Sequence, residues 1–472
     1  MRPFRLLVLL VLLVASLLTL LAPAEAADPV ELPGEFMGMV TRDPHYEWGT
    51  YPNFLGPNRA FYDAMGQNLR HAGVKWVRIE FRAEDPDTDM AGRVRLEQYD
   101  YFVNTVAPRY GFKVLALLAT PLAKWPEGLA PAGKRVGGYI EPKDPTYGID
   151  AGVTDPSCFP YGCGTNQYMR IWLKNAFEIA QRFPYNKTTG AGIAAYEVMN
   201  EENRYLNGGG SGMSPEQIGV LVTKFYRIFK HQSGPAGTLG EWRNDVQIIL
   251  VGIHPGRCDN CVRADGGIGM NDREYLNAIY RSRAFQNHRN DPVFGAYPID
   301  GVGYHPYPLE IRPGLLPEET AEPALGRVPE RIRAMRQVMV DNGDTGNGIW
   351  VTEIGDRGAP RDLDNQRRQA GFLRTIYWML WQERAYVKNV FWFKYEDFAV
   401  PTDPNATGPE NWGVVRLLPR TPKDCPDCDY DAAGTVQVYK QSFMAYANMS
   451  RFGTGLQTHR VYVPMMRQST TP

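Results

Sequence analysis

Two glutamates stand at the ends of short apolar segments, where a carboxylate needs a specific role. Glu201 follows the segment YEVMN and comes directly after Asn200, and Glu353 ends the segment GIWVTE. Burying a carboxylate at the end of an apolar segment costs free energy unless the group is paired or used. Two such carboxyl groups that face each other can do general acid–base and nucleophilic chemistry, with one protonated and the other ionised. This chemistry requires a fold that brings Glu201 and Glu353 together.

Short segments rich in Val, Ile, Phe and Trp alternate along the chain with longer helical patterns. The candidate strands occupy residues 36–41, 74–81, 112–119, 193–200, 246–252, 299–304, 349–353 and 389–394. The candidate helices lie near residues 57–72, 96–110, 166–183, 214–232, 271–288, 329–342, 362–384 and 435–450. Such alternation predicts a parallel sheet with helical crossovers, and eight units are the number that closes a barrel. The sequence therefore predicts the α/β class, as a single (β/α)8 TIM barrel.

The loops that follow the candidate strands are long, and they cover residues 120–165, 253–270, 305–328 and 395–434. In a barrel these loops lie at the C-terminal face, where active sites are built. Strands four and seven lie on opposite sides of a small barrel, so Glu201 and Glu353 would point across one mouth. An open, doubly wound sheet is the alternative fold. It would ideally show a Gly-rich turn after the first strand, where this chain reads TRDP at 41–44.

The first 26 residues have the pattern of a targeting segment. Arg2 and Arg5 precede an apolar run over 6–21, and the small-x-small motif AEA ends at Ala26. We expect a signal peptide at 1–26, a secreted barrel at 27–455 and a polar C-terminal tail at 456–472. An uncleaved signal anchor is the alternative, because the apolar run is of intermediate length. No later segment is apolar and long enough to span, so we expect an extracellular monomer without membrane contact after cleavage.

The cysteines fall into three close pairs, which are Cys158 with Cys163, Cys258 with Cys261, and Cys425 with Cys428. An even number of cysteines in an exported chain predicts disulfide bonds, here local ones that close small loops. The two C-x-x-C pairs could instead supply a zinc site with four thiolates. We expect the disulfides, and no metal.

Composition and motifs argue against several classes of function. The formal net charge is −1, whereas a nucleic-acid partner requires a basic face. The chain has only seven histidines and no H-E-x-x-H motif, which argues against a metal-dependent hydrolase. It also lacks the G-x-S-x-G motif of many serine hydrolases. Aromatic residues make up 12% of the chain, and their rings suit sugar faces as well as an ordinary core.

Several motifs in order along the chain resemble those of the clan A retaining glycoside hydrolases, the (β/α)8-barrel clan that includes families 5 and 39. In that clan an Asn-Glu pair ends the fourth strand and a Glu ends the seventh. The segment YEVMNEEN resembles the NEPN form, with Glu202 in place of Pro, and IWVTEIG resembles the nucleophile strand. The family 5 histidine near the third strand is missing from Ala119-Thr-Pro, so the chain is more similar to family 39.

Further motifs extend the resemblance over most of residues 36–450. The segment VKWVRIEF is similar to the clan's second strand, whose arginine, here Arg78, supports the nucleophile. The segment VGYHPYP carries the His-x-Tyr pattern at His305 and Tyr307, and VFWFKYEDF resembles the eighth strand, with Trp392 as the aromatic substrate floor. Trp125, Trp48 and Trp412 are candidate sugar platforms in loops.

The resemblance implies hydrolysis of O-glycosidic bonds by double displacement, without cofactor or metal. Glu353 would attack the anomeric carbon, and Arg78 with Tyr307 would favour its ionised form. Glu201 would protonate the leaving oxygen and then activate water, while Asn200 would bond the 2-hydroxyl. Glu202 is the alternative acid, but the register of the Asn-Glu pair favours Glu201.

The substrate is expected to be a carbohydrate. Long rim loops with tryptophans favour an extended cleft and endo action on a polysaccharide, and an exo-acting β-xylosidase-like or arabinosidase-like enzyme is the alternative. A non-catalytic carbohydrate-binding barrel would keep the aromatic rim but need not keep both glutamates in register.

Overall fold

Eight parallel strands form a closed barrel in the computed structural model, in the order β1-β12-β11-β10-β9-β8-β5-β4. They are β1 (Met37–Val40), β4 (Trp76–Glu80), β5 (Lys113–Leu118), β8 (Ile193–Asn200), β9 (Gln247–Ile253), β10 (Gly301–Tyr304), β11 (Gly348–Ile354) and β12 (Val387–Trp392). The structure describes residues 34–51, 54–83, 92–123, 135–136, 139–140, 165, 167–204, 213–232, 237–255, 270–308, 321–398, 411–419 and 430–452. All eight predicted strands are therefore confirmed, and the (β/α)8 barrel with them.

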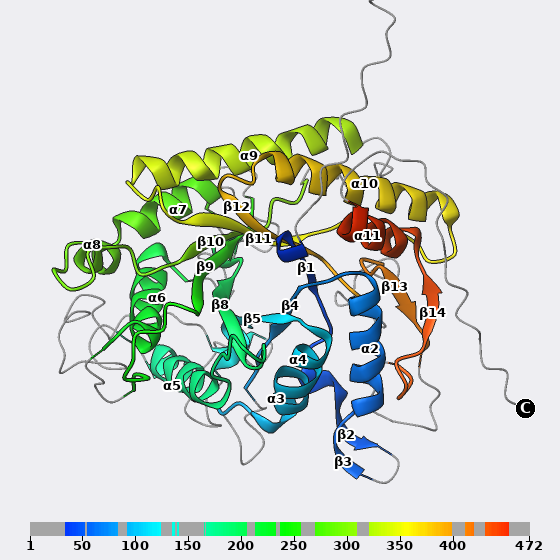
Figure 1. Ribbon diagram of the computed structural model, residues 1–472. Helices are drawn as coiled ribbons and strands as arrows, with labels where there is room; N and C mark the ends of the chain where they lie inside the picture. The colour runs from blue at the N-terminus through cyan, green and yellow to red at the C-terminus, as the bar shows by residue number, and fades with distance from the viewer. Residues whose placement is uncertain are drawn as a thin grey trace, which may run out of the picture.

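Helices surround the barrel and connect its strands (Figure 1). They are α2 (Arg59–His71), α3 (Glu97–Tyr101), α4 (Ala107–Tyr110), α5 (Gln167–Arg182), α6 (Pro215–Phe229), α7 (Asp272–Arg281), α8 (Arg283–Arg289), α9 (Ala321–Asp341), α10 (Leu363–Gln382) and α11 (Gln441–Phe452). A π-helical turn, Phe102–Val106, joins α3 to α4. Short 3-10 turns lie at Gly34–Phe36, Pro44–Glu47, Thr120–Leu122 and Glu202–Arg204. The helix expected over 271–288 is broken at Ser282, whose extended backbone caps α8.

Local capping chemistry explains where α6 begins. The Ser214 hydroxyl accepts a hydrogen bond from the backbone N–H of Gln217, and the Gln217 side chain accepts one from the backbone N–H of Ser214. This reciprocal pair satisfies two backbone donors that the helix itself leaves open. Pro215 occupies the first helical position, where its missing N–H costs nothing. The cap thus fixes where the chain turns back along the barrel after the loop that follows β8.

Two antiparallel hairpins were not predicted. One joins β2 (Trp48–Tyr51) to β3 (Phe54–Pro57), and the other joins β13 (Val415–Leu417) to β14 (Val436–Tyr439). The second hairpin takes the first residues of the helix expected over 435–450, so α11 begins only at Gln441. Among the described residues, a further antiparallel pair joins β6 (Arg135–Val136) to β7 (Tyr139–Ile140).

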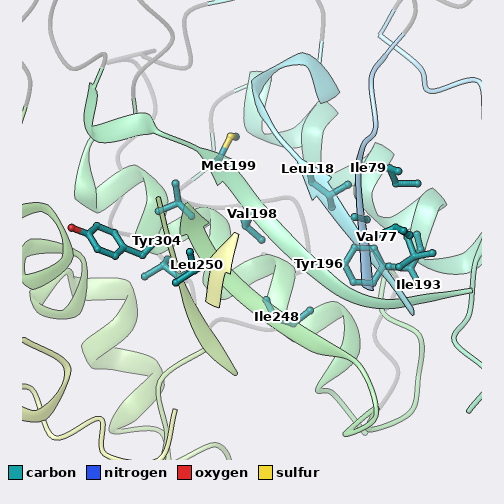
Figure 2. Close-up of a cluster of buried hydrophobic side chains, with 14 of the residues drawn as sticks. Val77, Ile79, Leu118, Ile193, Tyr196, Val198, Met199, Ile248, Leu250 and Tyr304 are labelled. Atoms are coloured by element: carbon teal, nitrogen blue, oxygen red, sulfur yellow. The ribbon is translucent and has the colours of Figure 1, made fainter. Parts of the chain in front are cut away.

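The barrel strands bury side chains on both faces, and this separates an outer from an inner core. The outer core packs the strands against the helices, and Figure 2 shows a part of it: Val77, Ile79, Leu118, Ile193, Tyr196, Val198, Met199, Ile248, Leu250 and Tyr304. The inner core contains Trp76, Trp350 and Phe391, with Trp76 edge-on to Trp350 at 5.3 Å between ring centroids. Because side chains alternate along a strand, Arg78, Thr352 and Phe393 lie on the same face, one layer nearer the mouth.

Several predictions fall outside the described residues. These are the signal peptide at 1–26, the tail at 456–472, Trp125, and all six cysteines with the alternatives of disulfides or a zinc site. The proposed domain boundaries stay predictions. Within the described part of the chain, no helix has the length and apolar character needed to cross a membrane.

Candidate active site

Arg78 of β4 connects the predicted site residues at the floor of the barrel mouth. Its side chain is buried and donates three hydrogen bonds: from Nε to Glu197 Oε2 at 2.6 Å, from Nη1 to Glu353 Oε1 at 2.7 Å, and from Nη2 to Asn200 Oδ1 at 2.9 Å. Burial alone would lower the pKa of Arg78, but Glu197 and Glu353 outweigh burial and raise it. Arg78 is thus a permanent cation that pairs with the carboxylates of Glu197 and Glu353.

Glu201 and Glu353 face each other across the mouth. One carboxylate oxygen from each, together with a ring nitrogen of His305, forms a group in which all atoms lie within 4.8 Å of one another. His305 Nδ1 lies 3.0 Å from Glu201 Oε1 and 3.6 Å from Glu353 Oε2. The Tyr307 hydroxyl donates to Glu353 Oε2 at 3.2 Å. The structure therefore brings together Arg78, Asn200, Glu201, His305, Tyr307 and Glu353.

Irregular backbone aims the two glutamates. Met199 and Glu201 have φ angles of 71° and 54°, in the left-handed region that side chains other than glycine rarely adopt. The N–H of Glu201 is held by the carbonyl of Gly252 at 2.8 Å. On the opposite side, the pairing of β11 with β12 shifts register between Val351 and Ile354, which lets both Thr352 and Glu353 reach the site. Such outliers persist only where the surrounding structure holds them, and they cluster at functional sites.

Glu202 points away from Glu353. Its Oε1 accepts a hydrogen bond from the Thr120 hydroxyl at 3.0 Å, and its Oε2 accepts one from the backbone N–H of Met213 at 2.9 Å. Glu202 thereby ties the loop after β5 to the loop before α6. Of the two adjacent glutamates, Glu201 is the one whose carboxylate faces Glu353.

Charges around His305 favour its protonated ring. His305 is fully buried, and burial alone would lower its pKa. The carboxylates of Glu353, Glu197 and Glu201 outweigh burial and raise the pKa to about 9. Glu201 and His305 therefore form a coupled pair that holds a proton at neutral pH. For Tyr307, burial and the charges of Glu353 and Glu201 raise the pKa well above its usual value, so its hydroxyl remains a donor.

The raised pKa of His305 predicts a loss of stability at alkaline pH. A group whose pKa is higher in the folded chain stabilises the fold fully below its unfolded pKa of about 6.5 and loses this contribution as the pH passes about 9. We expect up to about 3 kcal/mol of unfolding free energy to be lost over this window. Urea unfolding at pH values below about 6.5 and above about 9 checks this. Over the same window the His305→Gln variant should lose less unfolding free energy than the parent chain.

Glu197 was missed by the sequence analysis. Its side chain is fully buried, and besides Arg78 it contacts Thr352, whose hydroxyl donates to Glu197 Oε1 at 2.6 Å. Burial would raise the pKa of Glu197, but Arg78, His305 and Thr352 together lower it, so it is ionised. The signal was an acidic residue at the centre of the apolar segment IAAYEVMN, four positions before Glu201.

The prediction that Trp392 forms the aromatic floor of the site is wrong. Its ring is fully buried in the outer core, 6.0 Å from the ring of Phe372 on α10. Because side chains alternate along β12, the residues that face the barrel are Phe391 below and Phe393 at the mouth. Phe393 lies edge-on to Trp412 at 5.9 Å, and Trp412 lies 5.9 Å from Tyr307. The aromatic wall beside Glu353 is therefore formed by Phe393, Trp412 and Tyr307.

The other sequence candidates are placed as follows. Trp48 lies on β2 and is half-buried. Glu396, at the rim after β12, is fully buried, and its Oε1 lies 2.6 Å from Lys394 Nζ. Asp356, after β11, is half-buried, and its carboxylate lies 3.5 Å from Arg368.

The group Glu201, His305 and Glu353 has the size and donor set that could hold a metal ion. Two carboxylates and an imidazole would suit a divalent cation. Here, however, Glu353 already pairs with the Arg78 guanidinium, and Glu201 already pairs with His305. The donor atoms are thus engaged with protein cations, which suits carboxylate chemistry better than metal binding.

No protein-family model and no curated protein matches this sequence. Solved structures with a similar fold include a monomeric β-xylosidase from Caulobacter crescentus, at 15% identity and a TM-score of 0.51, covering 90% of this chain and 69% of that one. A family 39 glycoside hydrolase from Bacteroides cellulosilyticus gives 17% identity and a TM-score of 0.46, covering 90% and 65%. The catalytic domain of a family 53 enzyme from Ignisphaera aggregans gives 15% identity and a TM-score of 0.45, covering 90% of this chain and 99% of that one.

The chain therefore spans about two thirds of the length of the first two structures. At these identities the similarity concerns the fold. The resemblance to the barrel of clan A glycoside hydrolases, inferred from the strand-end motifs, is confirmed at that level.

Proposed function

We propose that this chain is a secreted glycoside hydrolase that cleaves O-glycosidic bonds by double displacement, with retention of configuration. The observation that carries the proposal is the short separation of Glu201 and Glu353, whose carboxylate oxygens approach within 4.8 Å. Retaining enzymes hold their two carboxyl groups about 5–5.5 Å apart, whereas inverting enzymes leave about 6.5–9.5 Å for a water molecule. The spacing supports direct attack by a carboxylate.

The surroundings of the two glutamates support different roles. Glu353 accepts hydrogen bonds from Arg78 and Tyr307, and both favour an ionised nucleophile. Glu201 shares a proton with His305, so it can act first as an acid and later as a base. Asn200 accepts from Arg78 through its Oδ1, which leaves its amide N–H groups for a sugar hydroxyl.

The reaction then proceeds in two steps. Glu353 attacks the anomeric carbon as the bond to the leaving oxygen breaks, and Glu201 gives that oxygen its proton. Water next attacks the glycosyl ester, gives its proton to Glu201, and releases Glu353 as a carboxylate. Glu197, Glu353 and Arg78 together leave net negative charge near the anomeric carbon, which favours a transition state with oxocarbenium character.

The proposal is tested with a panel of substrates and the stereochemistry of the product. Xylan, mannan, mixed-linkage glucan and galactan test endo action, and aryl β-xylosides test exo action, since the solved structures include a β-xylosidase. Proton NMR of the first product should show the anomeric configuration of the substrate. An inverted first product would refute the double displacement, and a purified chain that binds these glycans but cleaves none would favour the carbohydrate-binding alternative.

Replacement of Phe393 by alanine should weaken productive substrate binding. Phe393 is half-buried at the mouth and contacts Trp412, so its loss removes a ring on which a sugar face can pack. We expect kcat/KM to fall about tenfold, which is the effect of one lost stacking contact of about 1.4 kcal/mol. Trp392→Phe is the control: it should lower the unfolding temperature and leave kcat/KM of the folded enzyme nearly unchanged. If Trp392→Phe lowered kcat/KM and Phe393→Ala did not, Trp392 would be the substrate floor after all.

A further inference from the structure

A chain of buried hydrogen bonds connects Arg78 to Glu201 through residues that need not touch a substrate. Glu197 Oε2 accepts from Arg78 Nε, and Glu197 Oε1 accepts from the Thr352 hydroxyl at 2.6 Å. Thr352 Oγ1 lies 3.0 Å from His305 Nε2, and His305 Nδ1 lies 3.0 Å from Glu201 Oε1. Glu197, Thr352 and His305 are all fully buried. We call Glu197, Thr352 and His305 the relay.

The direction of each hydrogen bond in the relay follows from the chemistry of its members. Arg78 can only donate, and it keeps Glu197 ionised, so both oxygens of Glu197 must accept. The Thr352 hydroxyl therefore gives its only proton to Glu197. Its lone pair is left for His305, so His305 Nε2 must carry a proton. The proton that His305 gains or loses is consequently the one on Nδ1, between the ring and Glu201.

The backbone under the relay keeps these groups in place. A Cβ atom on Gly252 of β9 would lie 2.3 Å from His305 Nε2 and 2.6 Å from Glu197 Oε1, and one on Gly303 of β10 would lie 2.9 Å from the same Glu197 oxygen. The relay thus rests directly on the main chain of two strands. Such close packing restricts the ring of His305 and the carboxylate of Glu197 to their observed orientations.

We propose that Glu197 is a positioning residue which, through the hydroxyl of Thr352, fixes the tautomer of His305 and so places the shared proton next to Glu201. This inference rests on the proposed function, in which Glu201 supplies that proton to the leaving oxygen. The charged and titratable groups around His305 are Glu353 of β11, Glu197 of β8, Glu201 directly after β8, Arg78 of β4, and Tyr307 after β10. Of these groups, Glu197 is the one connected to His305 Nε2, through the Thr352 hydroxyl.

The Glu197→Gln variant tests the direction of the relay. The amide oxygen must face Arg78 Nε, since a nitrogen there would place two donors against each other, so the amide nitrogen faces Thr352. The Thr352 hydroxyl then accepts from Gln and donates to His305 Nε2. The neutral ring must therefore carry its proton on Nδ1, the opposite tautomer. A change of one atom at a buried position is expected to reverse two hydrogen bonds.

The experiment is an NMR titration of the whole chain with ¹⁵N-labelled histidine. The signals of His305 are identified by their loss in the His305→Asn variant. In the parent chain, Nε2 should stay protonated throughout and the proton lost at alkaline pH should leave Nδ1, whereas Glu197→Gln should show the Nδ1–H tautomer. A parent ring that, once neutral at alkaline pH, keeps its proton on Nδ1 would overturn the proposal, and so would an unchanged tautomer in Glu197→Gln. The parent spectrum suffices for this even if the variant does not fold, and it needs no enzymatic activity.

Kinetics supply the second readout. Glu197→Gln should move the alkaline limb of kcat/KM to lower pH by about one unit, because removing a negative charge eases loss of the shared proton. Thr352→Val should lower kcat about tenfold on aryl glycosides with poor leaving groups and much less with good ones, and Thr352→Ser should recover most of this loss. Thr223→Val, which removes an equally buried hydroxyl bonded to Gly219 O, is the matched control. Equal losses for both leaving groups would reduce Thr352 to a structural role and contradict the relay.

The two proposals can fail separately. If the parent chain cleaves no glycoside but shows Nε2–H that reverses in Glu197→Gln, the relay stands and the glycosidase function falls. If the chain is an active retaining enzyme but the tautomer does not depend on Glu197, the function stands and the relay falls.

Discussion

Glu353→Gln is expected to abolish turnover while leaving the barrel folded. The amide has nearly the shape of the carboxylate, and its oxygen can still accept from Arg78 Nη1, so the packing at the end of β11 is retained. It cannot, however, attack an anomeric carbon as an anion. We expect kcat to fall by at least about 10⁴-fold, which corresponds to about 5.4 kcal/mol of lost transition-state stabilisation. Steady-state kinetics with an activated aryl glycoside, together with circular dichroism, make the measurement.

Glu202→Gln is the matched control for this variant. It also neutralises a buried carboxylate at the mouth, but one that contacts Thr120 and Met213 instead of the site. It should lower the unfolding temperature, because a neutral amide makes weaker hydrogen bonds to Thr120 and Met213 than a carboxylate does, while kcat of the folded fraction stays near that of the parent chain. In the parent chain, a 2-deoxy-2-fluoro glycoside with a good leaving group should label Glu353 covalently, as mass spectrometry of peptides would show. Full activity in Glu353→Gln would refute the mechanism.

Much of the fold could be predicted because the eight barrel strands are buried on both faces. Such strands read as continuous apolar runs, and β8 over Ile193–Asn200 was predicted to the residue. Parallel strands also end at the same rim of a barrel, so residues at strand ends must meet. This is why residues as far apart in the sequence as Arg78 and Glu353 were placed in one site, where they now lie in direct contact.

The failures come from information that lies outside single segments. Trp392 and Phe393 are adjacent aromatic residues. A shift of one residue in the register of β12 would turn the Trp392 side chain toward the barrel and the Phe393 side chain toward the helices. Only the packing of Phe391 into the inner core fixes this register. The break at Ser282 and strand β14 lie in segments with an acceptable helical pattern, and β14 pairs with β13, which lies in a segment expected to be a loop.

Glu197 shows a different limit. An acidic residue inside an apolar strand can be a partner for an arginine, a catalytic group or an outward-facing charge, and the sequence alone does not separate these. The structure does so because Glu197 lies on the same inner face of β8 as Ala195, two residues before it, and accepts a hydrogen bond from Arg78 of β4. Strand β8 thus supplies Glu197, which we propose to orient His305, and leads directly into Glu201, the proposed acid.

Glu201→Ala should separate the two steps of the reaction. Without an acid, glycosides with poor leaving groups should lose about 10²–10⁴-fold in kcat/KM. Aryl glycosides with good leaving groups need no proton, so Glu353 should still form the glycosyl-enzyme, which then accumulates because the base for water is missing. A pre-steady-state burst of released phenol followed by slow turnover would show this accumulation.

Azide then identifies the face of the second step. The small anion needs no general base, and the shortened side chain leaves room for it beside His305, whose Nδ1 has lost its partner. Attack on the glycosyl ester from the side that Glu201 occupied should restore turnover on activated substrates and give a glycosyl azide with the configuration of the substrate. Because one displacement inverts the anomeric carbon and two restore it, this product requires Glu353 to have been bonded to that carbon. An azide product of opposite configuration would mean direct displacement from the substrate, and would exclude Glu353 as the nucleophile.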